Sequence, residues 1–200
     1  MVMSMNPESE ALSARECSSC NWQLPHGASA RERFDRLLAV VQRTGAAELA
    51  GRAYVNSAVG YEWRGLTVSD DWAEAYVLTP WMLARAYVPL SNPSIPLPAG
   101  WEAQVRAQQP FQLIGPAMVV VLGEEMHRLH LQWLPGYGHL LLQPLVQNLP
   151  RFTDAAEVWA AWDGVLAARD RGREARLAAL QQQNAALDRR EFLRRMIGAS

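Results

Sequence analysis

The fold is decided by the stretch AEAYVLTPWMLARAYVPL, residues 73–90, in which two apolar segments lie on either side of a proline. The segments are Ala73–Thr79 and Met82–Leu90, and both are rich in Val, Leu and Tyr. Short segments of this composition, interrupted by Gly or Pro, are typical of strands in an antiparallel sheet. The stretch therefore predicts two consecutive strands.

The same pattern continues on both sides of this stretch, from residue 52 to residue 146. It predicts four further strands: Ala53–Trp63, Ala117–Leu122, Arg128–Leu134 and His139–Gln143. Ser91–Gly100 contains three prolines, which lack the N–H that a strand ladder needs, so we expect an extended surface loop there. Pro135-Gly136-Tyr137-Gly138 is expected to turn a hairpin.

A helix is predicted before the sheet and another after it. Ser29-Ala30-Arg31-Glu32 matches the capping box that opens a helix, and Gly45 is its expected end. The second helix is expected to open at Thr153 and to lay an apolar stripe on the sheet, made of Trp159, Trp162 and Leu166. We predict an α+β fold: an antiparallel sheet covered by an N-terminal and a C-terminal helix. The domain would span residues 28–170, between a mobile N-terminal arm (1–27) and a polar linker with an extended C-terminal tail (171–200).

The composition indicates one globular domain, since 50% of the 200 residues are hydrophobic and 20% are charged. The 19 basic residues are all Arg and nearly balance 20 Asp and Glu, so the chain lacks the basic surplus of a general nucleic-acid binder. The charge is divided unevenly: residues 1–168 carry 11 Arg against 16 acidic residues, and residues 169–200 carry 8 Arg against 4. No apolar run reaches the about 18 residues of a membrane span, and no signal-peptide pattern opens the chain, so we expect a cytoplasmic protein without membrane insertion.

The two cysteines, Cys17 and Cys20, form a single C-x-x-C motif. Three interpretations are open: a redox pair, half of a zinc or iron site, or two free thiols. A tetrahedral site needs four ligands, and His26 is the nearby candidate for a third. Nothing strand-like precedes Cys17, as a thioredoxin-type pair would require. We favour free thiols, so no cofactor is expected, and Cys17 and Cys20 are weak metal candidates.

His127 and His130, with His139 as a third ligand, suggest a metal site at first sight. They lie in a segment that alternates apolar and polar residues, so two residues three apart point to opposite faces of a strand. We interpret these histidines as structural, and Glu124-Glu125 as a solvated turn rather than an acid/base pair. The motifs G-x-S-x-G, G-x-x-x-x-G-K-[ST], G-x-G-x-x-G and H-E-x-x-H do not occur. We therefore expect no catalytic residues and no enzymatic activity.

Eight tryptophans are more than a domain of this size needs for its core. Trp81 follows a proline and Trp101 follows a glycine, and we expect both to be exposed enough to anchor a binding partner, with Met82 beside Trp81. The alternative interpretation is that most of the tryptophans are core residues.

Thr79-Pro80-Trp81-Met82-Leu83 resembles the T-P-W-[MF]-[ML] signature of the HybE/HupJ/HoxT family of [NiFe]-hydrogenase assembly chaperones. Upstream, Tyr54-Val55-Asn56, Ala58-Val59-Gly60-Tyr61 and Trp63-x-Gly65 are similar to the family's V-N, A-V-G-F and W-x-G segments, in the same order. The resemblance covers about residues 30–168. It implies a cytoplasmic, non-catalytic α+β protein that holds a hydrogenase subunit precursor until its metal centres are in place.

The C-terminal tail carries a second resemblance. Asp188-Arg189-Arg190-Glu191-Phe192-Leu193-Arg194 is similar to the twin-arginine export box S/T-R-R-x-F-L-K. Export signals are N-terminal and continue into an apolar region, so a signal-peptide role is not expected here. Two interpretations stay open: the end of a basic amphipathic helix, or a mimic of the export signal of hydrogenase small subunits. In the second, Arg189, Arg190, Phe192 and Leu193 would contact a partner from a flexible tether.

The sequence thus predicts an assembly chaperone for a [NiFe]-hydrogenase, acting by binding. The expected partner is the precursor of the small subunit with its signal, of the large subunit, or of both, with other maturation proteins as further candidates. The alternative is an adaptor that delivers or protects an iron centre through Cys17 and Cys20. An enzyme would need a concave pocket that gathers His139, Glu124 or the cysteines.

Overall fold

The computed structural model describes residues 21–69 and 71–197, with side chains up to residue 180 except that of residue 178. Cys17 and Cys20 lie outside the described residues. The chain forms two compact units, one ending at Thr153 and one beginning at Asp154.

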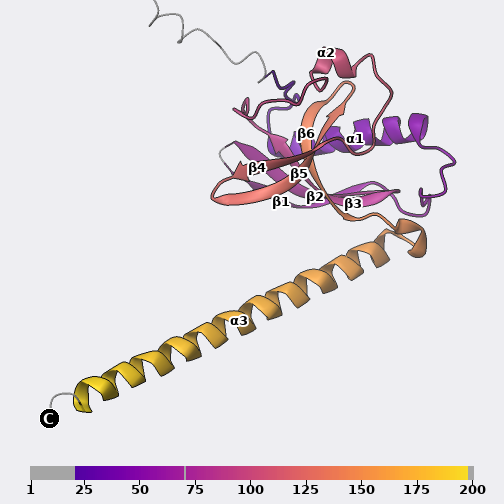
Figure 1. Ribbon diagram of the computed structural model, residues 1–200. Helices are drawn as coiled ribbons and strands as arrows, with labels where there is room; N and C mark the ends of the chain where they lie inside the picture. Colours follow the sequence, from indigo (N-terminus) through magenta and orange to yellow (C-terminus); the bar gives the residue numbers. More distant parts are fainter. Residues whose placement is uncertain (1–20, 70, 198–200) are drawn as a thin grey trace, which may run out of the picture. The chain divides into compact units, whose positions relative to one another are not determined.

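The first unit is built on an antiparallel sheet of six strands, shown in Figure 1. The strand order is β1-β2-β3-β6-β5-β4, so β1 and β4 are the two edges. The strands are β1 (Glu62–Val68), β2 (Trp72–Thr79), β3 (Met82–Pro89), β4 (Ala117–Leu122), β5 (Glu125–Leu134) and β6 (Gly138–Val146). The helical segments are α1 (Ala30–Glu48), α2 (Ala103–Arg106), a 3-10 turn (Leu149–Arg151) and α3 (Ala155–Ile197). The predicted α+β class, with an antiparallel sheet, an N-terminal helix and a C-terminal helix, is confirmed.

Helix α1 begins where the capping box predicts. The hydroxyl of Ser29 accepts a hydrogen bond from the Glu32 N–H (3.2 Å), and the Glu32 carboxylate accepts one from the Ala28 N–H (2.8 Å). Phe34, Leu37 and Val40 follow at helical spacing and are buried in the core between α1 and the sheet. This spacing is what directs one face of the helix onto the strands.

The predicted end of this helix at Gly45 is wrong, because α1 continues to Glu48. Gly45 lies in the helix against the indole ring of Trp81. A Cβ placed on Gly45 would lie 2.5 Å from Trp81 Cη2, closer than real contacts allow. This glycine therefore permits close packing and does not cap the helix.

The predicted strand Ala53–Trp63 is also wrong over most of its length, since residues 53–61 form turns and β1 begins at Glu62. Asn56 explains the difference. Its Nδ2 donates to the carbonyls of Leu149 (2.9 Å) and Phe152 (2.7 Å), and its Oδ1 accepts from the Ala58 N–H (3.0 Å). A side chain that satisfies backbone groups in this way replaces a strand ladder.

The other strands lie close to their predicted positions. The loop 91–100 and the Pro135–Gly138 turn between β5 and β6 are also as predicted. Gly136 has φ +72° and Gly138 φ +122°, which the turn requires and which glycine adopts readily.

The folded unit includes the last residues of the predicted arm. Trp22 is 6% exposed, and the carbonyl of Gln23 accepts a hydrogen bond from the His139 N–H (2.9 Å). Trp22 packs with Trp101, Leu129 and other residues of a second apolar core, distinct from the one beneath α1. The packed region therefore begins before the predicted boundary at residue 28.

The second unit contains one helix, α3, which runs without a break from Ala155 to Ile197. The Asp154 carboxylate accepts a hydrogen bond from the Glu157 N–H (2.9 Å) at its start. The predicted boundary at residue 170 lies inside this helix. Within the described part of the chain, no helix is both long enough and apolar enough to cross a membrane.

Candidate partner-binding site

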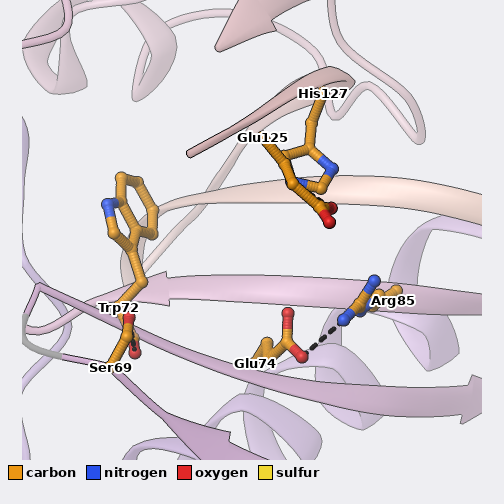
Figure 2. Close-up of polar contacts among 6 residues, drawn as sticks. All are labelled: Ser69, Trp72, Glu74, Arg85, Glu125 and His127. Carbon is orange, nitrogen blue, oxygen red and sulfur yellow. Dashed lines mark hydrogen bonds and ion pairs between the residues drawn. The ribbon is translucent and has the colours of Figure 1, made fainter. Parts of the chain in front are cut away.

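A pocket with charged walls opens on the sheet, between the β1–β2–β3 strands and the β4–β5 hairpin. It has a volume of about 260 Å³. Its lining comprises Thr67, Ser69, Trp72, Glu74, Arg85, Tyr87, Leu122, Gly123, Glu125 and His127. Figure 2 shows Glu74 and Arg85 on neighbouring strands, with Glu125 and His127 reaching toward them from the hairpin.

Glu74 and Arg85 form an ion pair inside the pocket. Arg85 Nη2 donates to Glu74 Oε1 at 2.5 Å, and both side chains are about one quarter exposed. The pair lies side by side because β2 and β3 are antiparallel neighbours. Burial lowers the pKa of Arg85, but the hydrogen bond to Glu74 and the nearby tyrosines outweigh it and raise the pKa above its usual value. The Arg85 guanidinium therefore stays charged and is hydrogen-bonded to Glu74.

Tyr87 supplies a polar group without a partner. Its side chain is 2% exposed, and no protein group within the described part of the chain hydrogen-bonds its hydroxyl. Its ring lies 5.9 Å from the His127 ring and 5.3 Å from the Arg85 guanidinium carbon. Burial is the main cause that raises the pKa of Tyr87 to about 12, so the hydroxyl is neutral at physiological pH. A buried hydroxyl that lines a pocket and has no protein partner is available to hydrogen-bond a water molecule or a polar ligand atom in that pocket.

The hairpin tip brings a second carboxylate to the pocket. Gly123 has φ +61°, as the first residue of a two-residue hairpin turn requires, so the chain reverses directly between Leu122 and Glu125. The Glu125 carboxylate lies 3.7 Å from His127 Nε2 and is 83% exposed. The pocket thus has a solvated carboxylate at its mouth, which can accept hydrogen bonds from a cation.

The outer face of the same hairpin carries a strip of exposed apolar side chains, defined as Val119, Val121 and Met126. They are 69%, 65% and 74% exposed, the highest values among the large apolar residues of the described chain. Val121 and Met126 are direct cross-strand partners, so the strip is continuous across the hairpin. An exposed apolar strip of this kind on an edge strand marks an interaction surface.

The structure places the predicted tryptophan anchors inside the protein. Trp81 is 5% exposed and Met82 6%, and both belong to the core beneath α1. Trp101 is 8% exposed and lies in the second core, with the Arg106 guanidinium 4.7 Å from its ring. The expectation that Trp81 and Trp101 are exposed is wrong. The neighbouring Pro80 and Gly100 turn the chain there, but the indole rings turn inward to fill space left by small residues such as Gly45 and Gly115.

The histidines have separate structural surroundings, as predicted for His127 and His130. His127 faces Val120 across the ladder on the pocket side, whereas His130 is on the opposite face beside Ala117. His139 is fully buried: its Nδ1 accepts from the Gln23 N–H (2.7 Å), and its Nε2 lies 2.8 Å from the Trp101 carbonyl and donates to it. No group of three or more His, Cys, Asp or Glu suited to a metal occurs among the residues with described positions.

The remaining predicted contact residues are in the tail. Arg189, Arg190, Phe192 and Leu193 lie within α3, and their side chains are outside the described part. The sequence patterns did not predict a role for Glu74, Arg85, Tyr87 or the apolar strip. One signal was available for the first two: each is a charged residue in the middle of an otherwise apolar strand.

A family model described as [NiFe]-hydrogenase assembly, chaperone, HybE matches residues 32–195. The chain belongs to the HybE family. The matched region contains every strand of the sheet, the charged pocket and the apolar strip. It also continues to Arg195, well beyond the limit near residue 168 that the resemblance indicated, so nearly all of α3 is part of the family region. Searches of curated proteins and of solved structures gave no match to this HybE-family chain.

Proposed function

We propose that this HybE-family chain is a cytoplasmic, non-catalytic chaperone that holds a [NiFe]-hydrogenase subunit precursor until its metal centres are complete. The observation that carries the proposal is the family match over residues 32–195. The surface supports a binding role, because the charged pocket and the exposed apolar strip occur together on one hairpin. Exposed apolar area beside specific polar groups is the composition of a recognition surface.

The small subunit with its twin-arginine signal is the precursor that this surface fits better. Such a signal places arginines directly before an apolar segment. The pocket offers the carboxylates of Glu74 and Glu125, and the strip of Val119, Val121 and Met126 offers apolar contact area. The large-subunit precursor is the other candidate, and further maturation proteins could join either complex.

The tail is proposed to imitate the export signal. Its sequence Arg189-Arg190-Glu191-Phe192-Leu193 supports this, as does its place inside the region that the family model matches. A mimic on the same chain as the chaperone domain would raise the local concentration of a signal-like segment near any shared partner.

Co-purification tests the function directly. The full chain, tagged and expressed in cells that make a [NiFe]-hydrogenase, is expected to retain a subunit in its precursor form and not the mature subunit. Recovery of neither subunit, with an unrelated protein enriched instead, would contradict the proposal. Metal analysis of the same anaerobic preparation addresses the adaptor alternative: stoichiometric iron or zinc that is lost in Cys17→Ser would favour it over the chaperone.

A further inference from the structure

We infer that an extended peptide binds along the free edge of β4 as an additional antiparallel strand, with an arginine near its N-terminal end in the charged pocket and apolar side chains on the strip. The inference rests on the proposed function, since the peptide would belong to the precursor. It assigns that function a binding mode, an orientation and a set of contact residues.

The free edge of β4 is unprotected. β4 is an edge strand of the sheet, and its sequence, AMVVVL, contains neither a charged residue nor a proline. Natural edge strands usually carry one of these, because they block pairing with another chain. The two-residue turn makes Leu122 and Glu125 a hydrogen-bonded pair. Along an antiparallel ladder, hydrogen-bonded pairs alternate with pairs whose backbone groups point outward, so Val121 and Val119 belong to the outward-pointing pairs. The N–H and C=O groups of Val119 and Val121 therefore point away from β5 and can pair with an added strand.

The pocket at the hairpin tip suits a guanidinium group. Figure 2 shows the Glu125 carboxylate directed toward the Glu74–Arg85 pair. The carboxylates of Glu74 and Glu125 therefore face the same space as the Arg85 guanidinium, which is already paired with Glu74. The unpartnered Tyr87 hydroxyl can accept a further hydrogen bond there, and the indole of Trp72 provides an aromatic surface. An arginine uses all of these at once, since its planar group has five N–H donors and stacks on rings, whereas lysine has a compact ammonium.

The direction of β4 sets the order of residues in the peptide. β4 runs from Ala117 toward the tip at Gly123, and the pocket is at this tip. An antiparallel peptide therefore has its N-terminal end at the tip and continues along Val121 and then Val119. This places the arginine before the apolar residues, in the order in which a twin-arginine signal has them.

Peptide binding to the purified full chain tests this mode. The probe is a fluorescent peptide with two arginines followed by an apolar run, measured by anisotropy. We expect the reversed order, an Arg→Lys version and a version with alternate backbone N-methyl groups each to bind about tenfold more weakly, a change of about 1.4 kcal/mol. Equal binding of the reversed or N-methylated peptide would overturn the strand orientation or the strand pairing.

Two matched pairs of variants locate the site. Glu125→Gln removes a pocket carboxylate, while Glu124→Gln removes the adjacent exposed charge outside the pocket lining. Val121→Ser shortens the strip, while Val68→Ser makes the same change at an exposed position on β1. We expect about tenfold weaker binding for the first member of each pair and no change for the second. Unchanged binding in Glu125→Gln and Val121→Ser would overturn the inference.

The outcome for the function is separable from the outcome for the binding mode. If wild type and Glu125→Gln retain the precursor equally well from cells, the chaperone function stands and the β4 site is wrong. If the peptide binds as described but no hydrogenase precursor co-purifies, the site stands as a peptide-binding site and the proposed function fails.

Discussion

The ring of Trp81 rests on the backbone of Gly45, so closely that a Cβ at Gly45 would lie 2.5 Å from Trp81 Cη2 and 2.6 Å from its Cζ3. The contact joins α1 to the turn between β2 and β3, inside the segment that carries the family resemblance. Trp81 of the T-P-W segment is thus a core residue whose place depends on a residue far away in the sequence.

Gly45→Ala is expected to destabilise the fold by about 1–3 kcal/mol, the usual cost of overpacking a core. Alanine is the better helix former by about 1 kcal/mol, so the sign of the measured change shows whether the clash outweighs propensity. Denaturant unfolding of wild type and Gly45→Ala measures this change in the free energy of unfolding. In the double variant Gly45→Ala/Trp81→Phe the smaller ring should relieve the clash, so that the two changes are not additive. A Gly45→Ala protein more stable than wild type would contradict the packing described.

Asn56→Ala is expected to destabilise the protein by about 2–3 kcal/mol, since each lost hydrogen bond contributes about 0.5–1.5 kcal/mol and the carbonyls of Leu149 and Phe152 lose a donor. Asn92→Ala removes an exposed amide and serves as the control, with little expected effect. Chemical unfolding of both variants gives the comparison. Equal stabilities would mean that Asn56 does not hold residues 53–61 to the 149–152 segment.

These two sites show where sequence patterns succeed and where they fail. The β2, β3, β4 and β6 strands were predicted because each is an apolar run bounded by turn residues, which is local information. The segment 53–61 has the same composition, but Asn56 bonds carbonyls nearly a hundred residues away, and no local pattern shows that. The burial of Trp81 depends in the same way on Gly45, and that of Trp22 on the second core.

The candidate site was predicted in fragments. Local spacing assigned Glu125 to a turn and placed His127 and His130 on opposite faces of a strand, whereas in the structure Glu125 is the first residue of β5. That Glu125 and His127 line one pocket with Glu74 and Arg85 is a long-range property, because the pocket joins β2 and β3 to the β4–β5 hairpin, which are not neighbours in the sheet order. Tyr87 lies in a largely apolar strand, and whether its hydroxyl has a hydrogen-bond partner depends on residues that the fold brings near it, which no local pattern predicts.

His139 predicts a pH dependence of stability. Burial lowers the pKa of His139 below its ordinary value of 6.5, although hydrogen bonds with Trp101 and Gln23 oppose this. At pH above about 6.5 the ring is neutral in the folded and the unfolded chain, so the stabilisation that depends on neutral His139 is fully present in the free energy of unfolding. As the pH falls below that value the unfolded chain takes up a proton that the folded chain does not, and the free energy of unfolding decreases.

The measurement is unfolding of wild type and His139→Gln between pH 7 and pH 4.5. Wild type should lose stability more steeply than the variant, while carboxylates and the other histidines affect both proteins alike. His26→Gln removes an exposed histidine and should keep the wild-type slope. Parallel profiles for wild type and His139→Gln would show that His139 does not remain neutral in the fold.

The tail can be tested by two charge-matched variants within α3. Arg189→Gln/Arg190→Gln removes the pair that resembles the export box, and Arg173→Gln/Arg176→Gln removes the same charge from a part of α3 that precedes the box. If the box imitates a signal, the first variant should lower hydrogenase activity in cells severalfold and the second should not. If these arginines act only through the general basic charge of residues 169–200, both variants should have the same effect. Far-UV circular dichroism should show α3 retained in both variants.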